Sequence, residues 1–103
     1  MIRRERLIRL TQEVVRIPSE NPPGDERRLA AFVARYLKKA GLAPRLIRFF
    51  PGRDNVLATL KGSSSRGSLL ITPHLDTVPA GSGWTHGPFS GTLKAGKIYG
   101  RGA

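Results

Sequence analysis

The stretch LLITPHLDTVP, residues 69–79, contains the features that decide how this chain folds and where its chemistry lies. It begins with a continuous apolar run, Leu69 to Ile71, which predicts a fully buried strand. His74 follows in the loop after that run, and Asp76 comes two residues later. In open α/β sheets, ligands bind at the carboxyl ends of strands. The sequence therefore predicts a functional site at His74 and Asp76.

Two helices are predicted before this stretch. From Ile2 to Arg16, apolar residues recur at steps of three and four along one helical face, and Pro18 ends the helix. Turn-forming residues 19–24 follow, and a second helix begins at Asp25 and stops at Gly41. Its apolar residues form a wide stripe: Leu29, Phe32, Val33, Tyr36, Leu37 and Ala40.

Short β-like runs replace the helical pattern after Pro44. Residues 46–50 and 56–60 are two such runs, each bounded by turn-forming residues, and both precede the run at 69–71. Near the end, residues 92–94 and 97–99 flank Ala95-Gly96, which predicts a hairpin. Two helices followed by several strands indicate an α/β layer architecture. At 103 residues, the chain forms one domain or part of one.

The composition narrows the possible metal ligands and the compartment. There are no cysteines, so any metal must be held by histidines and carboxylates. The basic N-terminus is not followed by an apolar leader, and no stretch approaches the roughly 18 apolar residues of a membrane span. We therefore expect a soluble, cytoplasmic protein with no membrane partner.

The net charge of +11 raises the alternative of a small basic nucleic-acid-binding module. The 18 Lys and Arg residues, however, are scattered over the predicted helices and strand ends. They contain no recognisable binding motif and no aromatic platform. We expect a solvated basic surface and no specific nucleic-acid partner. Affinity for duplex DNA that survives raised salt would favour the alternative.

The spacing of His74 and Asp76 suits a metal site. Metal-bound imidazoles commonly donate their second ring nitrogen to a carboxylate, which fixes the ring and its tautomer. His74 as ligand and Asp76 as its orienter would fit that arrangement. On spacing alone, a structural histidine at a strand end remains the commoner interpretation.

Several further motifs change this balance. Downstream of residue 79 stand Gly83-Trp84, Gly87-Pro88-Phe89 and the stretch GKIYGRGA at 96–103. Upstream stand Ile17-Pro18-Ser19, NPPG at 21–24 and Asn55-Val56. Taken in their order along the chain, these motifs resemble the family of acetylornithine deacetylase, succinyl-diaminopimelate desuccinylase, aminoacylase and glutamate carboxypeptidase. The resemblance covers nearly the whole chain.

This resemblance implies a fold and an activity. Residues 1–103 would be the N-terminal portion of a three-layer α/β/α zinc-exopeptidase-like catalytic domain, with the rest of that domain and a dimerisation domain absent. The complete protein would be a homodimer and a metal-dependent hydrolase. It would cleave the amide bond of an N-acyl amino acid or small peptide.

The resemblance also implies roles for single residues. His74 would bind one of two zinc or cobalt ions, and Asp76 would be the catalytic residue that supports it. Two ions roughly 3.5 to 4 Å apart would lower the pKa of a bridging water, and a glutamate would take its proton. In the family these other groups follow later in the chain, so residues 1–103 alone are expected to be inactive. Pro73 departs from the glycine that usually precedes the histidine.

His86 and Arg101 are two further candidates for the site. His86 matches no ligand position of the family pattern and is expected to be a loop residue. Arg101 fits two roles, orienting a carboxylate or stabilising the structure beside the metal loop. Trp84 and Phe89 are expected to pack the loop that walls the site.

Overall fold

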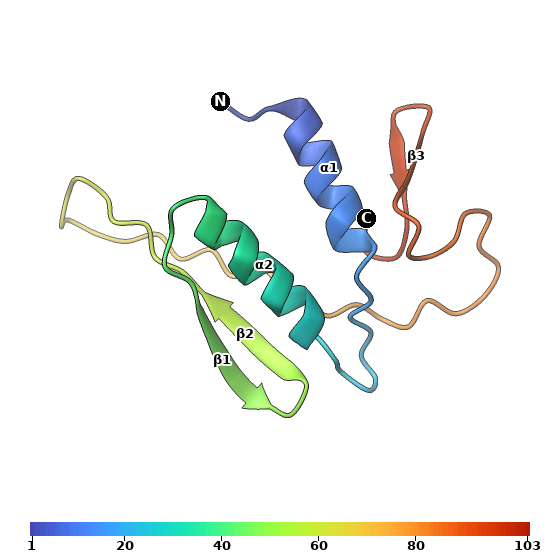
Figure 1. Cartoon of the computed structure of the whole chain (residues 1–103), viewed down its shortest axis with the longest axis horizontal. Helices are drawn as coiled ribbons and strands as arrows, with labels where there is room; N and C mark the ends of the chain where they lie inside the picture. The colour runs from blue at the N-terminus through green and yellow to red at the C-terminus, as the bar shows by residue number, and fades with distance from the viewer.

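The computed structural model describes all 103 residues and has the predicted order of helices followed by strands (Figure 1). The helices are α1 (Arg4–Val15) and α2 (Arg27–Lys39). The strands are β1 (Arg45–Phe50), β2 (Arg53–Leu57), β3 (Thr92–Lys94) and β4 (Lys97–Tyr99), which form two separate antiparallel pairs. The prediction of an α/β chain is confirmed at this level.

Helix α2 ends where its sequence predicts. Gly41 has a φ of +88°, a left-handed conformation that glycine adopts without steric cost. The amide of Gly41 donates to the carbonyl of Lys38, and the amide of Leu42 donates to that of Leu37. These two bonds satisfy carbonyls that the end of a helix leaves free. The helix buries Leu29 and Ala30, and it packs against β2 and β1.

Strand β2 begins earlier than the sequence suggested. The predicted strand covered residues 56–60, whereas pairing with β1 starts at Arg53 and ends where Arg45 opposes Leu57. Gly52, with a φ of +78°, makes the turn tight enough for pairing to begin at once. Residues 58–60 lie past the last paired residue of β1, so they have no partner strand.

The second hairpin is confirmed. Leu93 opposes Ile98, and the turn residues Ala95 and Gly96 both have positive φ, 49° and 75°. A turn with positive φ at both central residues has a twist that matches that of the two paired strands. The segment around this hairpin is held to α1, because Gln12 Nε2 donates to the Gly91 carbonyl at 2.7 Å.

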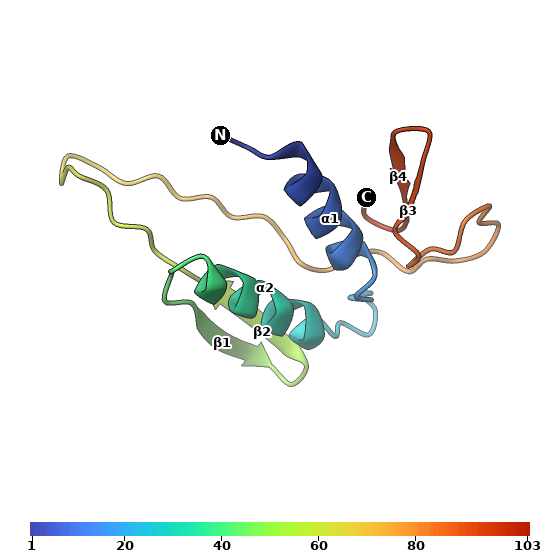
Figure 2. The same cartoon turned by 45° about the horizontal axis from the view of Figure 1, so that its top comes forward.

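The prediction of a buried strand at Leu69–Ile71 is wrong. These residues belong to no strand, and their exposed fractions are 85%, 78% and 78%. A buried strand needs a neighbour to pair with and layers to cover its faces. Figure 2 shows the chain leaving β2, turning back at its far end and returning as an extended segment, and the chain provides no strand beside it.

The apolar core is correspondingly small. Only Val15, Leu29 and Ala30 are buried hydrophobic residues. Helix α2 covers one face of the β1–β2 hairpin, while β1 is exposed along its whole length. Neither helix has the length and apolar character that a membrane crossing requires.

Candidate functional site

The loop that carries Asp76 is fastened to the loop between the two helices. The Thr77 amide donates to the Ser19 carbonyl at 3.0 Å, and the Asn21 amide donates to the Thr77 carbonyl at 2.8 Å. Glu20 and Thr77 thereby form an isolated parallel bridge. We call residues Ser19–Asn21 and Leu75–Ala80 the bridged loops.

Side chains strengthen the same junction. Ser19, which is buried, donates its hydroxyl to the Leu75 carbonyl at 2.8 Å. The Ala80 amide donates to Glu20 Oε2, also at 2.8 Å. The sequence predicts a turn at residues 19–24, and nothing local indicates a partner more than fifty positions away. The polar side chains of Ser19 and Glu20 are the only local physical signal, and loops commonly contain such residues.

His74 and Asp76 lie in direct contact. His74 Nδ1 is 2.8 Å from the Asp76 carbonyl oxygen and 3.1 Å from Asp76 Oδ1. Both oxygens are acceptors, so Nδ1 must carry the proton and donate it. In the neutral ring, Nε2 then keeps its lone pair. The His74 side chain is 83% exposed, so Nε2 is accessible to a ligand.

The second carboxylate oxygen of Asp76 has its own donor. Asn21 Nδ2 donates to Asp76 Oδ2 at 3.1 Å. This hydrogen bond is the main reason that the pKa of Asp76 lies below its ordinary value, with the His74 hydrogen bond acting in the same direction and partial desolvation opposing both. Asp76 is therefore ionised at neutral pH, as an acceptor of two hydrogen bonds should be.

Arg53 of β2 is the positively charged side chain nearest to Asp76 Oδ2. Its Nη2 is 3.8 Å from Asp76 Oδ2, which is too long for a hydrogen bond. The guanidinium instead binds Glu26 through two atoms, with Nη2 to Oε1 at 2.7 Å and Nε to Oε2 at 3.1 Å. The Glu26 hydrogen bond is the main cause that raises the pKa of Arg53 above its ordinary value. The buried carboxylate at the start of α2 thus anchors β2 beside the site.

The residues present fit one ligand position of a metal site. His74 offers a supported ring with an accessible Nε2, which is the arrangement that metal-bound histidines commonly have. No group of three or more His, Cys, Asp or Glu side chains in the chain could hold an ion. A catalytic zinc takes about three protein ligands. The residues of this chain therefore do not make up such a site by themselves.

The other candidate residues from the sequence make contacts that stabilise the structure. The His86 ring packs against Tyr99, with ring centroids 4.5 Å apart. Trp84 Nε1 donates to the Ala80 carbonyl at 2.9 Å, and Arg101 donates to the same oxygen at 3.2 Å. The Arg101 guanidinium also lies 5.1 Å from the centre of the Trp84 ring. Of the two roles that Arg101 could have, these contacts favour the structural one.

A groove of about 780 Å³ runs beside the site. Its walls come from α2, from β2 and from residues 70–76. Its lining includes the polar residues Glu26, Arg53, His74 and Asp76. The remainder is largely apolar and separates the free edge of β2 from the extended segment that the sequence predicted as a strand.

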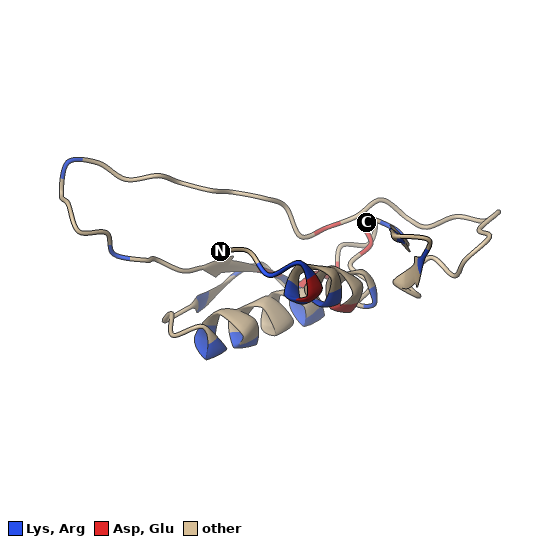
Figure 3. Ribbon diagram, turned by 90° about the horizontal axis from the view of Figure 1, so that it is seen from above, with Lys and Arg blue, Asp and Glu red and all other residues tan.

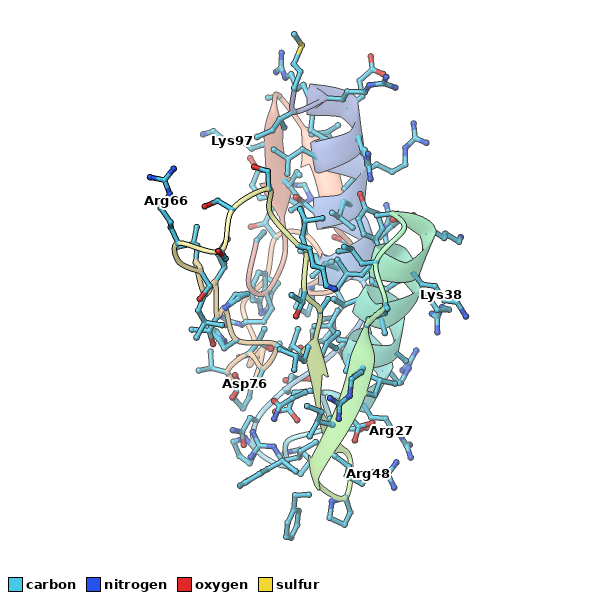
Figure 4. All side chains as sticks on the ribbon, turned by 90° about the vertical axis from the view of Figure 1, so that its left-hand side faces the viewer. Arg27, Lys38, Arg48, Arg66, Asp76 and Lys97 are labelled. Atoms are coloured by element: carbon cyan, nitrogen blue, oxygen red, sulfur yellow. The ribbon has the colours of Figure 1, made fainter.

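The positive charge is spread over the surface. Figure 3 shows basic residues on both helices, on the β1–β2 hairpin and on the loop between β2 and the site. In Figure 4 the labelled residues Arg27, Lys38, Arg48, Arg66 and Lys97 point outward from separate places, and Asp76 lies apart from them. No single basic face emerges, so the structure gives the nucleic-acid alternative no support.

Comparison with known proteins identifies the chain's relatives, although no family model matches it. It is 37% identical over 98 residues to succinyl-diaminopimelate desuccinylase from Methylorubrum extorquens (strain PA1), an alignment that covers 91% of this chain and 25% of that enzyme. It is 34% identical over 104 residues to N-formyl-4-amino-5-aminomethyl-2-methylpyrimidine deformylase from Halalkalibacterium halodurans, with 96% and 24% covered. The Bacillus subtilis deformylase of the same name is 32% identical over 105 residues, with 97% and 25% covered.

These relatives are hydrolases of the desuccinylase and deformylase type. The chain belongs to their deacylase family, as its motifs indicated, and corresponds to the N-terminal part of that family's sequence. It spans about a quarter of the length of the curated relatives it matches.

Proposed function

We propose that residues 1–103 are the N-terminal portion of a metal-dependent hydrolase that cleaves the amide bond of an N-acyl amino acid or small peptide. The observation that carries this proposal is the contact of His74 Nδ1 with Asp76. It leaves the other ring nitrogen accessible, within a chain related to desuccinylases and deformylases.

His74 Nε2 would hold one of two zinc ions, with cobalt as a possible replacement. Metal ions in such a site lower the pKa of bound water and polarise the substrate carbonyl. Asp76 acts as the residue that holds the His74 ring in one tautomer and one orientation. Its negative charge also makes the imidazole a better ligand. The bridged loops keep the backbone on both sides of Asp76 in place.

The surroundings of the groove support a larger catalytic domain. The free edge of β2, the exposed Leu70 and Ile71, and the uncovered face of β1 are surfaces that further strands and helices would cover. A three-layer α/β/α domain would do so, and we propose that the complete protein has this domain and forms a homodimer through another one. The relatives' names support removal of a small acyl group as the reaction, whereas peptide cleavage rests on the wider family resemblance.

Residues 1–103 alone would be inactive under this proposal. A catalytic zinc needs about three protein ligands, and one imidazole does not bind zinc tightly at neutral pH. Equilibrium dialysis of the chain with zinc, together with an assay on an N-acetyl amino acid, tests this point. Two ions bound per chain, or measurable turnover, would contradict it.

A chimera tests the role of His74. In this protein, residues 1–103 replace the matching part of the Methylorubrum extorquens desuccinylase, and turnover of succinyl-diaminopimelate is measured with the metal content. We expect His74→Ala to lose one metal ion per subunit and at least about 100-fold in turnover, since a ligand should matter more than its supporting groups.

His86→Ala is the matched control, because it removes the chain's other imidazole away from the contact with Asp76. It should keep both ions and most of the turnover. If His74→Ala also keeps two tightly bound ions and full turnover, His74 is not a ligand and the proposal fails.

A further inference from the structure

Asn21 reaches the site from outside the segment that contains His74 and Asp76. Its backbone amide donates to the Thr77 carbonyl at 2.8 Å, and its side-chain amide donates to Asp76 Oδ2 at 3.1 Å. One residue thus binds two consecutive residues of the opposite loop. The backbone hydrogen bond fixes the position of Asn21, so its side-chain amide stays within hydrogen-bond distance of Asp76.

The two carboxylate oxygens of Asp76 have different partners, while its backbone carbonyl oxygen also accepts from His74 Nδ1 at 2.8 Å. Oδ1 accepts from His74 Nδ1, and Oδ2 accepts from Asn21 Nδ2. A carboxylate is planar, so holding Oδ2 also sets the direction of Oδ1. Without the Asn21 amide, the carboxylate could rotate and turn Oδ1 away from the imidazole.

Neither of the other two side chains beside Asp76 can replace Asn21. Arg53 Nη2 is 3.8 Å from Asp76 Oδ2, beyond hydrogen-bond distance, and it already binds Glu26 at 2.7 Å. His74 is the group being oriented. Asn21 is therefore the sole side-chain donor that hydrogen-bonds Asp76 from a distant part of the chain.

We propose that Asn21 is a positioning residue, which fixes the Asp76 carboxylate so that it holds His74 as the Nδ1–H tautomer with Nε2 free for a ligand. Asn21 contacts neither substrate nor metal in this role. The inference rests on the proposed function in one respect, namely that His74 is the ligand that the arrangement serves.

The test measures the tautomer of His74 directly, without any metal. Long-range ¹H–¹⁵N correlation spectra of the ¹⁵N-labelled 103-residue chain give the ratio of Nδ1–H to Nε2–H imidazole at about pH 8.5, where histidine is neutral. His86 reports in the same spectrum as an internal reference.

Asn21→Asp has almost the same shape as asparagine but replaces the donating amide with a second carboxylate. We expect it to lower the Nδ1–H to Nε2–H ratio of His74 by about three- to tenfold, the scale of losing one orienting hydrogen bond. Asn21→Ala, which adds no charge, should lower the ratio in the same direction. The His86 signals should stay unchanged in both variants.

Gln12→Glu is the matched control. It also converts a part-buried donating amide into a carboxylate, and it removes the bond to the Gly91 carbonyl at 2.7 Å. It lies on α1, outside the bridged loops, so the His74 ratio should not change. A change of the same size in this control would mean that general destabilisation moves the tautomer, which would overturn the proposal.

Two further results would also overturn it. One is a His74 ratio that stays the same in both Asn21 variants. The other is loss of the dispersed amide spectrum in both, which would make Asn21 a residue that holds the fold. Failure of the proposed function is a separate result, because retained metal and turnover in the His74→Ala chimera would leave the tautomer measurement intact.

Discussion

Residues 75–80 of the bridged loops and the segment Gly67–Pro73 lie close together in the sequence but have opposite surroundings. Residues 75–80 accept hydrogen bonds from Ser19 and Asn21, and they donate others to Ser19 and Glu20. Residues 67–73 take part in no hydrogen bond, and the large apolar side chains there are exposed. Both segments carry a clear local pattern. What separates them is whether the chain itself contains the partner that the pattern requires.

Hydrogen exchange should show the largest difference between the two segments. The amides of Asn21 and Thr77 donate to backbone carbonyls, whereas those of residues 69–72 donate to none. Local opening must break several bonds in the first case and none in the second. We expect the first pair to exchange about 100-fold or more slowly relative to their intrinsic rates. Equal protection, measured by NMR on the 103-residue chain, would remove the contrast.

Asp76→Asn should weaken the site without emptying it. The substitution keeps the shape of the side chain but removes the charge and replaces one of the two acceptor oxygens, which now face His74 and Asn21, with a donor. Groups that orient a metal ligand typically contribute 10- to 100-fold in affinity or activity, and we expect a loss about this large in the chimera. Asp25→Asn, an exposed carboxylate on the preceding loop, is the control and should have little effect. Complete loss of metal with an intact fold would instead make Asp76 a direct ligand.

Ser19→Ala tests how much the bridged loops depend on side chains. The variant leaves the Leu75 carbonyl without the hydroxyl that now donates to it at 2.8 Å. Loss of one such buried bond should lower the free energy of unfolding of the chimera by about 1 to 2 kcal/mol, measured by urea denaturation. Ser64→Ala, at an exposed loop position, should leave it unchanged. Equal values for the two variants would show that the backbone bonds alone hold the loops.

Leu70→Asn should have the smallest effect on stability of the 103-residue chain. Leu70 is 78% exposed, so its replacement should change the free energy of unfolding by no more than about 0.5 kcal/mol. The same change at Leu29, which is 4% exposed, should cost several times more. An exposed apolar segment beside a free strand edge also invites association, so Leu70→Asn should reduce any oligomers seen by sedimentation velocity. A large loss of stability would mean that residues 69–71 are buried after all.

Local signals account for the parts of the fold that the sequence predicted. The apolar stripe and Gly41 define α2 without reference to any other element, and Ala95-Gly96 defines the β3–β4 turn in the same way. The local sequence alone could not decide whether Leu69–Ile71 forms a strand, because a strand forms only beside another strand. The apolar run indicates burial, but no pairing partner lies within the chain.

The candidate site was predicted in part for a similar reason. The His74 and Asp76 pair is local, and its two-residue spacing suggested the contact that the structure contains. Asn21 and Arg53 were missed as neighbours of Asp76, because their approach depends on how α2 and the β1–β2 hairpin bring distant segments together. The NPPG stretch predicts a turn and carries part of the family resemblance, but no physical rule connects its asparagine to a carboxylate far along the chain.

The bond between the Ser19 hydroxyl and the Leu75 carbonyl closes a loop with a sequence separation of 56 residues. Helix α2 and the β1–β2 hairpin lie entirely within that loop. The entropy cost of closing it rises only as the logarithm of its length, so ten added residues would increase the cost by about 0.1 kcal/mol. The exposed Lys61–Gly67 connection can therefore vary in length between related chains while the two ends still meet at the site. Length variation there should be the most tolerated kind of change in this part of the family.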